Sequence, residues 1–148
     1  MYYFAYGSNM NPDRVAERGL AVVSVEGAVL EGVSLAFNKR SGDHIGGHAN
    51  IVCAPSACVE GVLYGLRDAD QIQRMDRFEK TPVNYRRERV VVQTAAGAQA
   101  AWTYVANRAV IVEGLKPTRA YLNHLLAGRS YLSPQYYGWL AGLACVGD

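Results

Sequence analysis

The chain has 148 residues, half of them hydrophobic, and its 15 basic and 13 acidic residues give a formal net charge of +2. This length and apolar content fit one compact domain, residues 1–148, with a sizeable core. The small, dispersed positive excess gives no reason to expect binding to nucleic acid or to an anionic membrane. No basic segment precedes the apolar start Met1–Ala5, and Gly7 breaks that run. We therefore expect neither a secretory signal nor a membrane span, and a cytoplasmic protein.

The first expected element is a buried strand over Tyr2–Tyr6 that ends at Gly7-Ser8-Asn9. Gly can adopt a dihedral that other residues avoid, and Ser and Asn favour turns and caps, so N–H groups in this turn could converge on an anion. Asn11 as the cap and Pro12 in the first turn then predict a short helix that ends near Gly19. The plainer interpretation is a tight turn that only begins this helix.

The middle of the chain alternates apolar and polar residues, which is typical of strands. We expect strands over Val22–Val25, Ala28–Phe37, Ala49–Cys53 and Val59–Leu66, a glycine-rich loop over Arg40–His48, a hairpin of Arg86–Thr94 with Ala98–Val105, and a helix over Thr118–Leu126 that ends at Gly128. This pattern predicts an α+β fold with a small mixed, mostly antiparallel curved sheet or barrel flanked by a few helices.

One further helix is expected over Asp68–Lys80, with Asp68 as its cap and Thr81-Pro82 after its end. At 100° per residue, Ile72, Met75 and Phe78 share one face, and Glu79 projects into that apolar stripe. A carboxylate in this place faces the core.

Glu79 is the candidate for acid–base chemistry. Desolvation and the dipole at a helix C-terminus both disfavour the charged form of its carboxyl, which suits a base that works near neutral pH. The alternative is a structural Glu paired with a buried arginine or a strand N–H, because such pairs also perturb acids.

These motifs together resemble the γ-glutamylcyclotransferase family. Tyr3–Asn9 resembles its strand ending in Tyr-Gly-Ser-Asn, and Asp76-Arg77-Phe78-Glu79 falls where the family has Asp-x-x-Glu. The intermediate segments Gly46–Ile51 and Glu60–Tyr64 also match in order and spacing. The resemblance weakens after Val105, where Pro117–Tyr121 matches only a looser Pro-Ser-x-x-Tyr pattern. The Tyr-Gly-Ser-Asn form argues against the glutathione-specific branch.

The resemblance implies an enzyme that converts a γ-glutamyl amino acid or amine to 5-oxoproline and a free amine, with Glu79 as the general acid and base. It implies a small-molecule γ-glutamyl substrate, neither metal nor organic cofactor, and a monomer or homodimer. The substrate-binding residues that it implies are Tyr3, Phe4, Ala5, Tyr6, Gly7, Ser8, Asn9, Tyr85 and Tyr121.

Other functions stay open at this point. A non-catalytic γ-glutamyl or carboxylate-binding module would keep the anion-holding turn, although it would have no reason to keep an acid on an apolar face. Ser8 lacks the Gly-x-Ser-x-Gly context of a nucleophile elbow, and the glycines around His44 and His48 disfavour a helical metal site. The cysteines, Cys53, Cys58 and Cys145, are predicted to be buried thiols. Core packing is the first interpretation of the aromatic patch of Tyr136, Tyr137, Trp139 and Leu140, and a dimer contact or a pocket lid are the alternatives.

Overall fold

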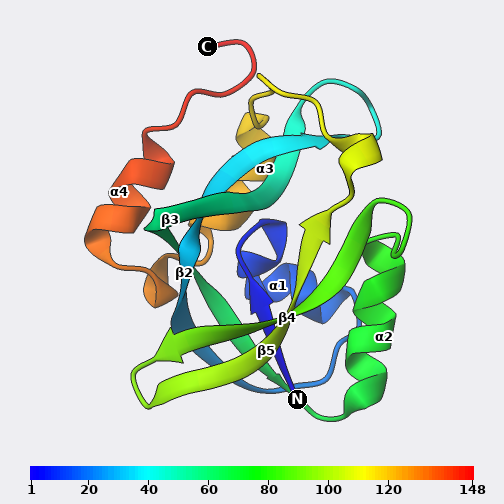
Figure 1. Ribbon diagram of the computed structural model, residues 1–148, viewed down its shortest axis with the longest axis vertical. Coiled ribbons are helices and arrows are strands. Elements are labelled where there is room, and N and C mark those ends of the chain that lie inside the picture. The colour runs from blue at the N-terminus through cyan, green and yellow to red at the C-terminus, as the bar shows by residue number, and fades with distance from the viewer.

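Five strands close into a barrel in the computed structural model, which describes residues 1–148 (Figure 1). Their order around the barrel is β1-β3-β2-β4-β5. All neighbours are antiparallel except β1 and β5, which pair in parallel through Tyr3 and Trp102. The prediction of a mixed, mostly antiparallel curved sheet or barrel is therefore confirmed. The strands are β1 Tyr2–Ala5, β2 Val22–Arg40, β3 Gly47–Leu66, β4 Tyr85–Thr94 and β5 Gly97–Ala106.

The strands β2 and β3 are longer than expected. Four predicted strands merge into two, of 19 and 20 residues, that pair with each other along most of their length. The register shifts between Val22 and Ser24, between Glu31 and Val33, and between Ala36 and Lys39. Such irregularities bend a long strand without ending it. The sequence break between Cys53 and Val59 thus coincides with a register shift, whereas the break at Glu26-Gly27 lies in an uninterrupted ladder.

The first two helices begin at the predicted caps. Asn11 accepts a hydrogen bond from the Asp13 N–H over 3.1 Å, and Asp68 accepts one from the Asp70 N–H over 3.2 Å. Figure 1 shows α2 on one side of the strands and α4 on the other. The helices are α1 Pro12–Glu17, α2 Ala69–Phe78, α3 Arg119–Leu126 and α4 Pro134–Ala141, with short 3-10 turns at Ser8–Met10, Arg108–Val110 and Arg129–Tyr131.

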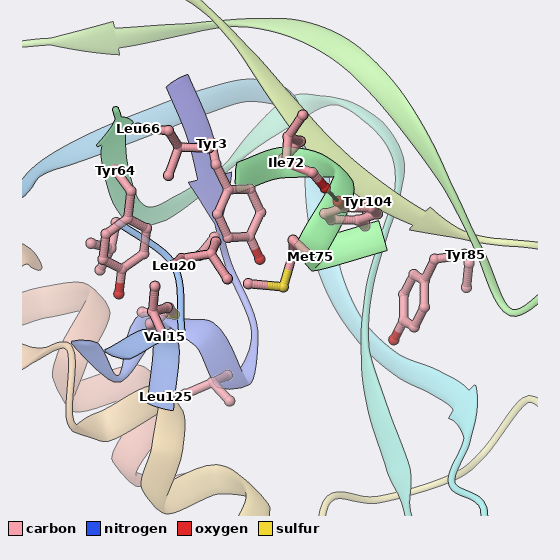
Figure 2. Close-up of a cluster of buried hydrophobic side chains, with 14 of the residues drawn as sticks. Tyr3, Val15, Leu20, Tyr64, Leu66, Ile72, Met75, Tyr85, Tyr104 and Leu125 are labelled. Carbon is pink, nitrogen blue, oxygen red and sulfur yellow. Dashed lines mark hydrogen bonds between the residues drawn. The ribbon is translucent and has the colours of Figure 1, made fainter. Parts of the chain in front are cut away.

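Alternate side chains of β1 enter two different hydrophobic clusters. Phe4 joins a cluster built almost entirely from strand residues, which fills the barrel. Tyr3 and Ala5 join a larger cluster that packs the strands against the helices. In that cluster the Tyr3 ring lies between Tyr64 and Tyr104, with ring centroids 6.0 Å and 5.7 Å away (Figure 2). The strand β1 therefore has both faces buried, which holds the turn after it in place.

Three burial predictions are wrong in part. Phe78 was placed on the core face of α2 but is 47% exposed, because it ends the helix at the rim of the fold, where the Arg18 guanidinium covers its ring at 4.9 Å. Cys53 and Cys58 are exposed, since they lie where the β2–β3 ribbon changes register, and only Cys145 is buried. Of the aromatic patch, Leu140 is buried whereas Trp139 is 48% exposed on the outer face of α4. None of the helices is long and apolar enough to cross a membrane.

Candidate active site

A cavity of about 250 Å³ opens where β1 ends. The end of β1 and its turn form one wall and the end of α2 a second. Residues of α1, β2, β3, β4, β5 and α3 complete the lining. Every predicted site residue except Ala5 lines this cavity. Ala5 shares the Tyr3 side of β1 but carries only a methyl group, which stays within the core cluster. The predicted lining residues are Tyr3, Phe4, Tyr6, Gly7, Ser8, Asn9, Glu79, Tyr85 and Tyr121.

Glu79 caps the C-terminus of α2 and opens into the same cavity as the Gly7-Ser8 backbone. Its side chain is 17% exposed, and its Oε1 lies 3.9 Å from Arg18 Nη1. Burial raises the pKa of the Glu79 carboxyl above its usual value, and the nearby charges of Arg18, Lys39 and Arg14 oppose that rise. Features of both interpretations of Glu79, a desolvated base and a Glu paired with an arginine, are therefore present: the carboxylate is desolvated in a cavity and lies near Arg18.

Asn9 connects the groups around Glu79. Its Nδ2 donates to Glu79 Oε1 over 3.1 Å and to the Tyr3 hydroxyl over 2.9 Å. Its Oδ1 accepts a hydrogen bond from Arg18 Nη1 over 2.9 Å. The Tyr64 hydroxyl donates to the Asn9 carbonyl over 2.6 Å and so ties the backbone of the turn to β3. With 2% exposure, Asn9 is a buried amide that orients the carboxylate and the guanidinium together.

Gly7 combines an unusual backbone conformation with a close approach to its neighbours. Its φ of −113° and ψ of −137° lie outside the helical and extended regions, as expected for a dihedral that other residues avoid. A Cβ at this position would lie 3.0 Å from the Ala49 Cβ and 3.2 Å from the Tyr121 hydroxyl. A bare backbone therefore leaves room at the cavity wall. The N–H groups of Gly7, Ser8 and Asn9 donate no hydrogen bond to another backbone group, although the Ser8 backbone contacts the Tyr121 hydroxyl and lowers its pKa, so this turn presents N–H groups to the cavity.

Tyrosines form much of the cavity wall, and several of their hydroxyls are occupied. Tyr6 donates to the Tyr104 carbonyl, and Tyr85 donates to the Ala49 carbonyl over 2.8 Å. The Tyr121 hydroxyl accepts from the Ala49 N–H over 2.9 Å, and burial raises its pKa to about 12. Burial likewise raises the pKa of Tyr3, Tyr6 and Tyr85. These tyrosines thus shape the cavity as neutral side chains.

Four basic side chains line the cavity beside the single acid Glu79. They are Arg14, Arg18, Lys39 and Lys80, and the sequence analysis named none of them. Arg14 and Arg18 are four residues apart on one face of α1, a spacing that could have flagged them once α1 was known to border the turn. Lys39 and Lys80 carry no such local signal. The cavity is therefore strongly suited to anionic ligands.

The structure assembles neither a nucleophile–base pair around Ser8 nor a metal site. The Ser8 hydroxyl makes no hydrogen bond with a histidine, and no set of three or more His, Cys, Asp or Glu side chains is arranged to hold a metal ion. His48 stacks on Tyr121 with ring centroids 4.4 Å apart, whereas His124 contacts Asn11 at 3.1 Å. Burial and the Lys39 charge lower the pKa of His48 to about 4, so this ring is neutral at pH 7.

Comparison with protein families matches residues 3–124 to the family described as gamma-glutamyl cyclotransferase, AIG2-like. The chain belongs to this family. The matched range runs from β1 through most of α3 and contains every residue that lines the cavity. A comparison with curated protein sequences gave no match.

Solved structures of gamma-glutamyl cyclotransferases share the fold. One structure with that name has a TM-score of 0.85 at 24% identity and covers 100% of this chain and 90% of its own. The human uncharacterized protein loc79017 has a TM-score of 0.85 at 25% identity, with 99% and 89% coverage. A yeast cyclotransferase specific to glutathione has a TM-score of 0.69 at 11% identity, with 95% and 93% coverage. At these identities the likeness supports the fold of the family and leaves the substrate to be argued from the cavity.

Proposed function

We propose that this protein is a γ-glutamyl cyclotransferase that converts a γ-glutamyl amino acid or amine to 5-oxoproline and the free amine. The observation that carries the proposal is the placement of Glu79 in the same cavity as the bare Gly7-Ser8 backbone, with no other acid in the lining. One side of the cavity thus offers a proton acceptor, and the other offers anion-binding N–H groups. Membership of the family supports the same activity.

The substrate supplies its own nucleophile. The α-amino nitrogen attacks the γ-carbonyl carbon, a new C–N bond closes the five-membered lactam, and the original γ-amide C–N bond breaks. A free α-amino group has a pKa of roughly 8, so most of it is protonated near neutral pH and a base must take a proton before attack. Glu79 accepts this proton and delivers it to the leaving nitrogen. The attacking nitrogen loses a second proton after attack, which passes through the same carboxyl to the departing amine, so the amine leaves as an ammonium and the carboxyl returns to its starting state.

Pre-organisation of the bound substrate explains why few catalytic groups are enough for ring closure. Holding the extended glutamyl chain in a folded conformation brings the amine close to the carbonyl, which removes much of the entropic barrier to ring closure. The N–H groups of Gly7, Ser8 and Asn9 hold the α-carboxylate or the oxyanion that forms during attack. Each correctly aimed donor of this kind contributes ~3 kcal/mol in other enzymes.

The surroundings of Glu79 support its role as the base. Burial raises the pKa of its carboxyl, which makes it a better proton acceptor than an exposed Glu. The Asn9 amide holds Oε1 at 3.1 Å, so the carboxylate keeps one orientation. Arg18 Nη1 lies 3.9 Å from Glu79 Oε1, and its charge favours the ionised form of the carboxyl. A structural ion pair alone would not need to open into a cavity.

The test is 5-oxoproline release from a panel of γ-glutamyl amino acids, γ-glutamyl amines and glutathione. Glu79→Gln keeps the shape of the side chain and removes the base, so we expect kcat to fall by about 10²- to 10⁴-fold. Asp76→Asn is the matched control. Asp76 lies on the same helix, receives a hydrogen bond from the Tyr104 hydroxyl over 2.7 Å and does not line the cavity. We expect it to retain activity.

Full activity in Glu79→Gln would contradict the mechanism. Absence of 5-oxoproline from every substrate, together with binding of γ-glutamyl compounds by calorimetry, would instead support the non-catalytic carboxylate-binding module. The two results are distinct, because the first concerns the variant and the second the unmodified protein.

A further inference from the structure

Lys39 is a largely buried residue whose ammonium has no ion-pair or hydrogen-bond partner and faces the cavity. It lies next to last in β2 and is only 7% exposed. It takes part in none of the five ion pairs of the protein and in no side-chain hydrogen bond; its Nζ lies over the Tyr85 ring, 5.8 Å from the centroid. Removing an ammonium from water without a counter-ion is costly, so such a group in a cavity points to an anionic ligand.

The position of Lys39 places this charge beyond the turn that holds the glutamyl half. Lys39 pairs with His48 across the β2–β3 ladder, and His48 stacks on Tyr121. The Tyr121 hydroxyl in turn lies against Gly7. The stacked rings of His48 and Tyr121 therefore connect the strand position that carries Lys39 with the Gly7 turn, so a ligand with two anionic groups could reach both.

The other cations of the cavity have different surroundings. Arg18 donates to Asn9 and lies near Glu79, while Arg14 Nη1 lies 3.5 Å from the His124 ring and its Nε is buried without a hydrogen-bond partner. Lys80 is exposed at the rim. The charged groups that act on Lys39 are Lys80 and Arg40, which repel its charge, and Glu79, which favours it, so no carboxylate of the protein fully compensates it.

We propose that Lys39 binds the carboxylate of the leaving amino acid and makes the protein prefer γ-glutamyl amino acids to γ-glutamyl amines. This inference rests on the proposed function. A γ-glutamyl amino acid carries two carboxylates, one in the glutamyl half and one in the leaving half. A γ-glutamyl amine lacks the second carboxylate and leaves the Lys39 ammonium desolvated and unpaired in the complex, which disfavours binding.

The test uses two substrates that differ by one carboxylate, γ-glutamyl-alanine and γ-glutamyl-ethylamide. We expect the protein to prefer the alanine compound in kcat/KM by about 10- to 100-fold, the usual effect of a charge-assisted hydrogen bond. Lys39→Met keeps the length of the side chain and removes its charge. Measured at a pH where Glu79 is fully ionised in both proteins, it should lose most of this preference by falling on γ-glutamyl-alanine alone, whereas Lys39→Arg should retain part of it. Arg40→Met is the matched control, because Arg40 is exposed and lies outside the cavity, and it should behave as the unmodified protein.

Each other outcome overturns the inference. An equal loss on both substrates in Lys39→Met would show that Lys39 binds the α-carboxylate of the glutamyl half. Unchanged selectivity would show that it touches neither carboxylate. If the unmodified protein releases 5-oxoproline from neither compound nor from the wider panel, the proposed function itself fails. Thermal unfolding separates these results from misfolding, since removal of an unpaired buried charge should leave the unfolding temperature of Lys39→Met no lower than that of the parent.

Discussion

The Asn9 amide donates a hydrogen bond to Glu79 Oε1 over 3.1 Å and links residues 70 positions apart in the chain. One comes from the turn after β1, and the other caps α2. The amide is buried, and its nitrogen and oxygen form hydrogen bonds with Tyr3, Glu79 and Arg18. The proposed base is therefore held by the same turn that is proposed to bind the substrate. A change in the turn should also change the orientation of the Glu79 carboxylate.

The first prediction tests this link with Asn9→Leu, which keeps the volume and removes the polar atoms. Glu79 and Arg18 each lose a buried hydrogen-bond partner, so we expect the free energy of unfolding to fall by about 1–3 kcal/mol. We also expect kcat to fall by about 10- to 100-fold, because the carboxylate loses its orientation. Urea denaturation and steady-state kinetics measure the two effects. A variant with unchanged kcat would show that Asn9 does not position the base.

The second prediction concerns the pH dependence of activity. Burial raises the pKa of Glu79, so the basic carboxylate becomes the main form only above the usual Glu value of roughly 4.3. We expect kcat/KM to rise with pH through this raised pKa. Lys39 lowers the pKa of Glu79, so Lys39→Met should move the acid limb to higher pH. A profile of kcat/KM against pH for both proteins gives the answer, and an unmoved limb would contradict the coupling.

The third prediction concerns stability. Because the folded-state pKa of Glu79 is raised, the folded protein binds this proton more tightly than the unfolded chain does. Its contribution to stability is therefore full below the unfolded pKa and is lost as the pH rises through the folded pKa. Glu79→Gln does not titrate, so its stability relative to the parent should be greater at pH 8 than at pH 4.5. Denaturation curves at both pH values test the sign, and the reverse order would refute the raised pKa.

A fourth prediction uses the close approach at Gly7. In Gly7→Ala the new methyl group meets Ala49 at 3.0 Å and the Tyr121 hydroxyl at 3.2 Å, so it narrows the cavity. We expect KM to rise, and Gly7→Val to be affected more strongly. Gly138→Ala is the control, since a Cβ at that position in α4 meets nothing within 4 Å. Equal kinetics in the three variants would mean that space at Gly7 does not matter for binding.

The fifth prediction follows from the exposure of the thiols. Cys53 and Cys58 should react with a thiol reagent such as DTNB in the folded protein, and Cys145 only after unfolding. Titration before and after denaturation should therefore count two thiols and then three. Single Cys→Ser variants assign each signal. Three reactive thiols in the folded state would contradict the burial of Cys145.

Local patterns identify most elements of this fold because they report local physics. Asn11 and Asp68 cap helices because their side chains satisfy free N–H groups two residues later, an effect that needs no distant partner. The hairpin of β4 and β5 likewise forms around a short turn near Gly97. The continuity of β2 and β3 was missed, because whether a strand ends or bends depends on the strand beside it.

The candidate site likewise has residues that the sequence indicates and residues that only the structure brings together. The turn over Gly7-Ser8-Asn9 and the acid at Glu79 stand out in the sequence, because an interrupted strand and a carboxylate on an apolar helix face are local anomalies. Arg18 and Lys39 do not stand out, since a basic residue on a short helix or at a strand end is ordinary until its neighbours are known. Burial without a counter-ion is a property of the assembled cavity.

The sequence by itself thus determined the type and order of most elements and the two ends of the proposed site, because propensity, capping and side-chain periodicity act over a few residues, and its motifs in their order carried the resemblance to the family. Only the tertiary structure decided that β1 closes the barrel against β5, that Asn9 reaches Glu79, and that Lys39 lies unpaired beside Tyr85. These contacts join segments far apart in the chain, so they depend on barrel closure and on desolvation of the cavity, which no local pattern encodes.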